Sequence, residues 1–474
     1  MRTAYSVETV RAAERELMAR LPEGALMQRA AAGLATACAQ LLGRVYGARV
    51  VLLVGSGDNG GDALYAGARL ARRGAGVAAV LLSPEKAHRG GLAALRAAGG
   101  RVSADARRDI ARAALVVDGI VGIGGRGGLR PEAAQLAREA WESAPVVAVD
   151  LPSGVDADSG EVAGDAVRAD ATVTFGAYKP GLLIDPAHER AGALRLVDIG
   201  LPLPHEADVE ALQHADVARL LPRPAPESDK YRRGVVGVVA GSARYPGAAV
   251  LAVAGALRGG AGAVRYVGPA AEAVLAHFPE TLVHAGPPDK AGRVQSWVIG
   301  PGIGEESDAL EDVLAAEVPV LVDADGLRFL TPRRVAERPA PTLLTPHAGE
   351  AAALLGRGRE EVEAARLASA RELAARYGAT VLLKGSTTLV AEAAGPVRVN
   401  PTGSSWLATA GSGDVLSGLT GSLLAAGLTA RDAGSGGAYL HGLAARRAAG
   451  PDGAPILASE VADHLAASWR DVTG

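Results

Sequence analysis

Residues 49–63, RVVLLVGSGDNGGDA, decide the fold, because an apolar run passes directly into a glycine-rich loop. A buried strand, such a loop and a helix together open a parallel α/β unit, and the glycines even have the spacing of a dinucleotide-binding loop. Two carboxylates argue against that interpretation. Asp58 and Asp62 would put negative charge where a pyrophosphate has to bind. We therefore expect the loop to bind a cation or a set of hydroxyl groups.

The composition favours a folded protein that acts on small molecules. The chain has 474 residues, of which 49% are apolar and only 3% aromatic, so Ala, Val and Leu must build the core. Its net charge of -3 gives no electrostatic reason to expect nucleic acid or an anionic membrane as a partner. The single cysteine, Cys38, excludes an internal disulfide and is expected to serve packing. No signal peptide or membrane-spanning segment is predicted, so a cytoplasmic protein is expected.

The chain divides into two halves, and each half begins afresh with an apolar strand and a glycine loop. Further strands follow at intervals with Ala-rich helical patterns between them, which is typical of a parallel α/β sheet. Prolines, charges and the lack of a strand pattern place the boundary near residues 205–228. We therefore predict α/β domains at residues 1–210 and 225–474, each with its chemistry at the carboxyl ends of the strands.

Three oxygen-bearing side chains follow predicted strands in the first half. Asn59, Asp118 and Ser153 offer an amide carbonyl, a carboxylate and a hydroxyl, which are ligands for an alkali or alkaline-earth ion. The alternative is structural, because Asp62 would also suit a helix cap and Asp118 a turn. Three such residues at one edge of a sheet favour a site.

The motifs of the first half resemble the NAD(P)H-hydrate epimerases. They are GSGDNGGDA, VVDGIVGIG (116–124), AVDLPSGVDADSG (148–160) and TFGAYKPG (174–181), although Asp58 and Ala63 depart from the family's usual Asn-Asn-Gly-Gly-Asp-Gly. The resemblance covers about residues 1–205 and implies a Rossmann-like sheet and a K⁺ held by Asn59, Asp118 and Ser153. The residues that it implies for the hydrated coenzyme are Asp58, Asn59, Gly60, Gly61, Asp62, Gly122, Ile123, Gly124, Gly125, Arg126, Gly127, Gly128 and Asp150.

Epimerisation of such a hydrate requires a positioned acid or base. The hydroxyl on carbon six of the nicotinamide ring must leave and return from the opposite face, so a group must protonate the departing oxygen. Asp150 ends an apolar strand, where desolvation would raise its pKa. Lys179 is a candidate partner, although a lysine on a loop is often only solvated. We therefore rank Asp150 above Lys179.

The second half carries a different signal, the loop GSGD at residues 411–414 directly before a helix. Main-chain amides at a helix N-terminus form an anion hole for a phosphoryl group, and Asp414 could accept the proton of an attacking hydroxyl. A plain helix cap is the competing interpretation. Lys384 at a strand end, together with His347 and Glu350 at a helix start, favours the catalytic one.

Taken in order, the motifs of residues 228–474 resemble the ADP-dependent NAD(P)H-hydrate dehydratases, which have a ribokinase-like fold. NPTGSSWLA (400–408) departs from the family's Asn-Pro-Thr-Gly-Asn-Pro-Gly at Ser404, Ser405 and Trp406. The resemblance implies hydrate contacts from Ala249, Gly302, His347 and Asp414. It implies nucleotide contacts from Lys384, Gly385, Ser386, Thr387, Thr388 and Gly413.

Together the two resemblances imply a bifunctional repair enzyme. It would epimerise R- and S-NADHX or NADPHX, and dehydrate the S form to NAD(P)H with Mg²⁺ and ADP, releasing AMP and phosphate. The residues leave another class open, a ribokinase-type small-molecule kinase whose N-terminal domain only binds nucleotides. A homo-oligomer is expected from the resemblance, and the choice of ADP over ATP rests on the resemblance alone.

Overall fold

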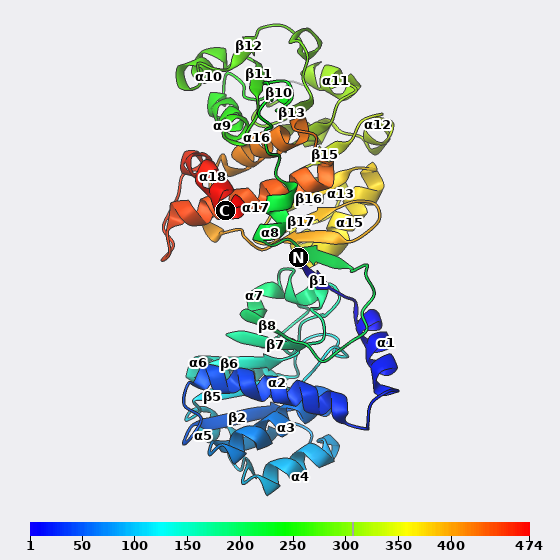
Figure 1. Cartoon of the computed structure of the whole chain (residues 1–474), viewed down its shortest axis with the longest axis vertical. Helices are drawn as coiled ribbons and strands as arrows, with labels where there is room; N and C mark the ends of the chain where they lie inside the picture. Colours follow the sequence, from blue (N-terminus) through cyan, green and yellow to red (C-terminus); the bar gives the residue numbers. More distant parts are fainter. Residues whose placement is uncertain (306–307) are drawn as a thin grey trace. The chain divides into compact units, whose positions relative to one another are not determined.

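The computed structural model describes residues 1–305 and 308–474, which form two compact units. The N-terminal unit is Thr3–Asp208, and the C-terminal unit comprises Met1–Arg2 and Val209–Gly474. Each unit is built on one β-sheet with helices packed against it (Figure 1). The predicted α/β class is confirmed for both halves.

The sheet of the N-terminal unit has seven strands in the order β4-β3-β2-β5-β6-β7-β8, and every neighbouring pair is parallel. The strand β2 lies between β3 and β5, so the order reverses there and the loops after β2 and β5 diverge to opposite faces. A ligand site is expected at that switch point. The strands are β2 (Arg49–Val54), β3 (Gly76–Leu81), β4 (Arg101–Val102), β5 (Leu115–Gly119), β6 (Val146–Val149), β7 (Ala171–Phe175) and β8 (Ala193–Val197).

Helices cover both faces of this sheet. On one face α2 (Ala25–Leu42), α3 (Asp58–Arg72) and α4 (Arg89–Ala97) share a core with the strands, and Cys38 is buried there as expected. On the other face lie α5 (Ala106–Ile110) and α6 (Pro131–Ser143). The remaining helices are α1 (Val7–Met18) and α7 (His188–Ala191). Position 55 has room only for glycine, because a Cβ there would lie 1.8 Å from the carbonyl oxygen of Ile120. The segments that follow β2 and β5 are therefore in direct contact at this point.

The sheet of the C-terminal unit has eleven strands in the order β1-β9-β18-β17-β16-β15-β14-β13-β10-β11-β12. The run from β12 to β16 is parallel, and β17 is antiparallel to both of its neighbours. Here the order reverses between β10 and β13. The strands are β1 (Arg2–Ala4), β9 (Val209–Ala211), β10 (Val235–Val239), β11 (Ala263–Val267), β12 (Leu282–His284), β13 (Ser296–Ile299), β14 (Val320–Val322), β15 (Thr342–Leu344), β16 (Thr380–Leu383), β17 (Thr388–Ala391) and β18 (Val397–Asn400).

Two closely packed helices of this unit position the predicted GSGD loop, residues 411–414. Helix α9 (Pro246–Arg258) packs so closely on α16 (Ser412–Ala425) that a Cβ at Gly418 would lie 1.9 Å from the carbonyl oxygen of Ala252. This contact fixes where α16 begins and therefore where its first amides lie. The other helices are α8 (His214–Leu220), α10 (Ala271–His277), α11 (Asp308–Ala315), α12 (Pro332–Ala336), α13 (Ala348–Leu355), α14 (Arg359–Ala364), α15 (Arg366–Tyr377), α17 (Ala430–Ala449) and α18 (Ala458–Thr473).

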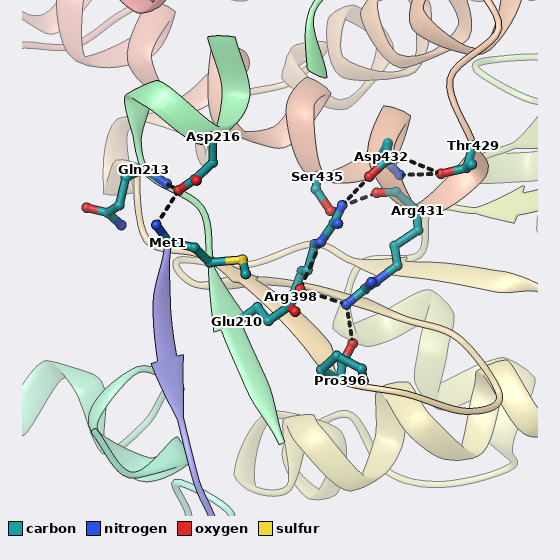
Figure 2. A network of polar contacts seen from close by, with 10 residues as sticks. All are labelled: Met1, Glu210, Gln213, Asp216, Pro396, Arg398, Thr429, Arg431, Asp432 and Ser435. Atoms are coloured by element: carbon teal, nitrogen blue, oxygen red, sulfur yellow. Dashed lines mark hydrogen bonds and ion pairs between the residues drawn. The ribbon is translucent and has the colours of Figure 1, made fainter. Parts of the chain in front are cut away.

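The stretch between the two halves differs from its prediction. Where no strand pattern was expected, the structure has β9 and α8, and both belong to the C-terminal unit. Partly buried charges anchor β9: Glu210 accepts from Arg398 of β18 (3.3 Å) and Arg431 of α17 (2.9 Å), and Arg398 also pairs with Asp432 (Figure 2). A three-residue strand is too short to show alternation, which is why the sequence pattern missed it.

No helix among the described residues is long and apolar enough to cross a membrane.

Candidate active sites

The three predicted cation ligands of the N-terminal unit meet at the carboxyl edge of its sheet. Ser153 Oγ donates to Asp118 Oδ1 (2.7 Å), and the Ser153 amide donates to Asp118 Oδ2 (2.8 Å). Asn59 Nδ2 donates to the carbonyl oxygens of Val149 (2.6 Å) and Val121 (3.4 Å). The Val121 carbonyl also lies 3.1 Å from Ser153 Oγ, so both side chains converge on it. All three residues are buried.

Asp118 supplies the carboxylate of this cluster and is fully buried. Burial raises its pKa to about 6, while hydrogen bonds from Ser153 and the amide of Ile120 lower it. Asn59 Oδ1 faces the adjacent loop, because a Cβ at Gly122 would lie 2.4 Å from it. The cluster therefore offers oxygen ligands and neither a ring nitrogen nor a thiol, which suits a hard cation.

Asp150 and Lys179 form a buried ion pair beside this cluster. Lys179 is 1% exposed, and its Nζ contacts Asp150 Oδ1. It also donates to Thr174 Oγ1 (3.0 Å) and to the carbonyl of Phe175 (3.2 Å). Asp150 has φ of 68°, a left-handed conformation that is uncommon for a residue with a side chain. Lys179 is thus not a solvated loop lysine, and Asp150 is not a solitary acid.

The predicted hydrate-binding loop 122–128 borders a cavity of about 190 Å³. Ile123, Gly124, Gly125 and Arg126 line it, and α1 supplies the opposite side through Val7 and Arg11. Arg11 lies against the loop, because a Cβ at Gly124 would be 2.9 Å from its Nη2. The structure therefore brings this loop together with a helix in which the sequence indicated no functional residue.

The two acids of the glycine loop have different surroundings. Asp58 is exposed at the start of α3, and Asp62 is buried one turn later. Glu14 of α1 is half-buried and interacts electrostatically with Asp150, Lys179 and Asp58. Sequence reasoning missed Glu14, since α1 carries acids at several positions and nothing in the pattern distinguishes this one.

In the C-terminal unit, Lys384 lies at the centre of a buried polar network. Its Nζ donates to Asp323 Oδ1 (2.6 Å), and Ser417 of α16 donates to Asp323 Oδ2 (2.6 Å). Glu350 Oε2 lies 3.8 Å from the same ammonium. Although burial lowers the pKa of Lys384, the carboxylates of Asp323 and Glu350 raise it above its ordinary value. Lys384 is therefore a fixed positive charge at the ends of β14 and β16.

Asp414 stands in the first turn of α16, close to this network. Burial, together with the carboxylate of Asp323, raises its pKa to about 7, although Lys384 acts in the opposite direction. A Cβ at the preceding Gly413 would lie 3.4 Å from Lys384 Nζ, so the anion-hole loop and the lysine are adjacent. A carboxyl with a pKa near 7 beside amides and an ammonium is suited to general-base work on a phosphoryl acceptor.

The predicted nucleotide loop, residues 384–388, is half open. Gly385 and Ser386 are exposed, whereas Thr387 and Thr388 are buried. Arg366 of α15 holds the loop from behind through the carbonyls of Lys384 (3.0 Å) and Thr387 (3.1 Å). Only the tip of this loop is therefore open to a ligand.

The other residues predicted to contact the hydrate differ in their exposure and surroundings. His347 is exposed at the N-cap of α13, where its Nδ1 accepts from the amides of Gly349 and Glu350. Gly302 adopts φ of 66°, and a Cβ there would lie 2.7 Å from Ala248. Ala249 is fully buried, so it stays a prediction that no exposed atom supports.

Asp323 and Ser417 were also missed as site residues. Asp323 had a signal, because the sequence DADGL follows the apolar run VPVLV, as the other site loops follow their strands. Ser417 had none, since a serine within a helix of small residues is usually packing. Arg366 had none either, because its contacts are all to main-chain carbonyls of a distant loop.

The fold and the sites define a class of protein, an enzyme with two α/β domains. In the second domain a fixed lysine suited to phosphate binding lies near a carboxyl group suited to act as a general base. Family models agree with this division: "YjeF-related protein N-terminus" matches residues 23–181 and "NAD(P)H-hydrate dehydratase" matches residues 236–466. The chain belongs to the bifunctional NAD(P)H-hydrate repair enzymes.

Relatives support this membership over the whole chain. A bifunctional NAD(P)H-hydrate repair enzyme of Mycobacterium leprae is 50% identical over 98% of this chain and 98% of its own length. One from Mycobacterium tuberculosis is 52% identical over 91% of each chain. Among solved structures, the ADP/ATP-dependent NAD(P)H-hydrate dehydratase of Bacillus subtilis, co-crystallised with ATP and Mg²⁺, has a TM-score of 0.51 and 29% identity. The match covers 55% of this chain and 97% of that one, and it confirms the ribokinase-like fold.

Proposed function

We propose that the two sites divide the repair of hydrated nicotinamide coenzymes between them. The N-terminal site interconverts the R and S hydrates of NADH and NADPH, and the C-terminal site dehydrates the S form at the expense of ADP. The observation that carries this proposal is the contrast between the two sites. A buried ion pair beside oxygen ligands suits proton chemistry, whereas a fixed lysine beside a general base suits phosphoryl transfer.

In the dehydration, we assign Asp414 the role of general base. It takes the proton of the carbon-six hydroxyl as that oxygen attacks the β-phosphorus of ADP, and AMP leaves. The amides of residues 411–413 and the ammonium of Lys384 stabilise the transferred charge. Phosphate then departs with the electron pair of the carbon–oxygen bond, assisted by the ring nitrogen. Loss of a proton from carbon five restores the dihydropyridine, so the products are NAD(P)H, AMP and phosphate.

The hydrate and nucleotide contacts proposed for this site are those expected from the sequence. Ala249, Gly302, His347 and Asp414 would face the hydrate, and Lys384 to Thr388 with Gly413 would face the nucleotide. Mg²⁺ would accompany the nucleotide, in line with the Bacillus subtilis dehydratase that was co-crystallised with ATP and Mg²⁺. An ion of this kind takes its ligands largely from phosphates and water and neutralises phosphate charge.

In the epimerisation, Asp150 and Lys179 would contact the reacting ring. Thr174 holds the pair on one side, and the buried ammonium and carboxylate would orient the hydroxyl and the ring nitrogen. Residues 58–62 and 122–128 would bind the rest of the coenzyme.

K⁺ would be held by Asn59, Asp118 and Ser153. The residues fit the ion, because the Ser153 hydroxyl links the buried Asp118 carboxylate to the Val121 carbonyl, and the Asn59 amide contacts the same carbonyl. A large monovalent cation accepts such mixed oxygen ligands. Its bound charge would favour anionic groups of the coenzyme nearby.

One assay tests the proposed function against the kinase alternative. The full chain is incubated with ADP, Mg²⁺, K⁺ and a mixture of R and S hydrates, and the absorbance of re-formed NADH is followed. Complete conversion of both epimers is expected. Conversion of the S form alone would contradict the epimerase assignment, and phosphorylation of a pyrimidine or sugar alcohol without NADH would support the kinase. Equal rates with ADP and ATP would contradict the preference for ADP.

We also propose domains at residues 1–210 and 225–474, a cytoplasmic location and a homo-oligomer. The single cysteine supports a reducing compartment. Sedimentation that returned only monomer would contradict the oligomer.

A further inference from the structure

Asp62 is a buried carboxyl with an unused oxygen. The residue is 6% exposed, and its Oδ1 has no hydrogen-bond partner in the structure. A buried carboxylate oxygen without a donor is costly unless the group is protonated or meets a ligand. Asp62 lies on α3 one turn after Asp58, within the segment 58–62 that is proposed to bind the hydrate.

Three other carboxylates interact electrostatically with Asp62. Asp58 comes from its own helix, Asp150 from the end of β6, and Glu14 from α1. His88, at the start of α4, lies against the neighbouring Gly61, with its Nδ1 accepting from Gly91. The cation Lys179 contacts Asp150 rather than Asp62.

The helix that carries Glu14 is fixed in place. Ser6 caps α1 and receives support from Asp208, whose Oδ2 accepts from the Ser6 amide (2.8 Å). Val10 packs with Ala177 and Ile123, which follow β7 and β5. Glu14 follows Val10 by one turn and therefore lies on the same face of α1. The packing of α1 against these residues therefore determines the position of Glu14.

These neighbours determine the protonation of Asp62. Burial raises its pKa well above the ordinary value, and the charges of Asp150, Asp58 and Glu14 raise it further. Burial also raises the pKa of Glu14, partly offset by Lys179. The raised pKa of Asp62 favours its protonated, acidic form.

We propose that Asp62 is the proton donor of epimerisation and that Glu14 is a positioning residue that keeps the proton on Asp62. This rests on the proposed epimerase function. Asp62 gives its proton to the carbon-six hydroxyl, and the carbon–oxygen bond breaks with its electron pair going to the departing water. The ring nitrogen lone pair stabilises the resulting cation, which faces the carboxylate of Asp150. Water then adds to the opposite face and releases its surplus proton to solvent, while Asp62 regains a proton from solvent, so no oxidant or other reactant is consumed.

The first test is Asp62→Asn, which keeps the shape and removes the exchangeable acid. Conversion of R to S hydrate should fall by about 10² to 10⁴. Dehydration of purified S hydrate should be unchanged, which shows that the chain is folded. An R-to-S rate within about threefold of the parent would overturn the proposal, since loss of an acid catalyst costs far more. A parent protein that does not epimerise at all would overturn the proposed function itself.

The second test is Glu14→Gln, with Glu16→Gln as the matched control on the exposed side of the same helix. Removing the Glu14 charge should let Asp62 lose its proton at lower pH. The alkaline limb of the epimerisation profile should therefore move to lower pH, whereas Glu16→Gln leaves it in place. A Glu14→Gln profile of unchanged position would overturn the role of Glu14, because a purely structural effect would lower the rate at every pH alike.

Discussion

The carboxylate of Asp323 binds Lys384 through one oxygen, at 2.6 Å, and is held by Ser417 through the other. Asp323 is 1% exposed, so neither oxygen is left for water. The pair fixes the ammonium at the carboxyl edge of the sheet, beside Gly413 and below Asp414. A lysine that reached the nucleotide from a loose loop would instead have to be ordered at each binding event.

Asp323→Asn should weaken nucleotide binding and lower the stability of the C-terminal unit. Removing one partner of a buried ion pair leaves the other charge uncompensated, which typically costs about 3–5 kcal/mol. A lower melting temperature and a raised KM for ADP are expected. Asp325→Asn is the matched control, because Asp325 is more exposed and serves a peripheral contact with Gly304. Equal behaviour of the two variants would contradict the positioning of Lys384 by Asp323.

Asp414→Asn should abolish most of the dehydration while sparing nucleotide binding. The amide keeps the shape but cannot accept the hydroxyl proton, so turnover on S hydrate should fall by about 10² to 10⁴. ADP affinity, measured by calorimetry, should persist or increase, since a negative charge near the phosphates is removed. Epimerisation should not change. Turnover within about threefold of the parent would mean that Asp414 is only a helix cap.

The pH dependence of dehydration should report the same carboxyl. Burial and neighbouring carboxylates raise the pKa of Asp414 to about 7, so its basic form is the minor one below that pH. Therefore kcat/KM should rise about tenfold per pH unit up to about 7 and then level off. The profile of S-hydrate turnover measures this. A flat profile between about pH 5 and 8 would contradict Asp414 as the base.

Asp118→Ala should impair epimerisation and its dependence on K⁺. The variant removes the buried carboxylate of the proposed ligand set, and losses of about 10–100-fold are typical when support of a metal site is removed. The parent should lose R-to-S conversion in a tetramethylammonium buffer and regain it when K⁺ is added. Glu142→Ala, on an exposed position of α6, serves as the control. Dehydration of S hydrate should survive in both variants, and its loss would contradict separate sites.

The sequence predicted most of what strand ends contribute. Asn59, Asp118, Ser153 and Asp150 follow apolar runs, and parallel strands bring such ends to one edge, so their proximity could be predicted. What it could not predict is what helices bring to that edge from elsewhere. Glu14 reaches the site only because α1 docks on residues after β5 and β7, a tertiary contact that no local pattern records.

The same limit explains the boundary region. The prolines and charges of residues 205–228 do indicate a break between units, yet β9 and α8 form within it because partners elsewhere in the chain complete them. Glu210, read alone, is an exposed linker acid; with Arg398 and Arg431 it becomes part of an anchored sheet edge.

The pairing of β1 with β9 has a consequence for biosynthesis. The ribosome delivers β1 first, but its partner strand emerges only after the whole of the N-terminal unit has been translated. The edge strand of the larger sheet, β1, is therefore synthesised before the whole N-terminal unit and can pair with β9 only after that unit has been translated. A nascent chain stalled before residue 209 would carry β1 without its neighbour, and would form that pairing only when translation resumed.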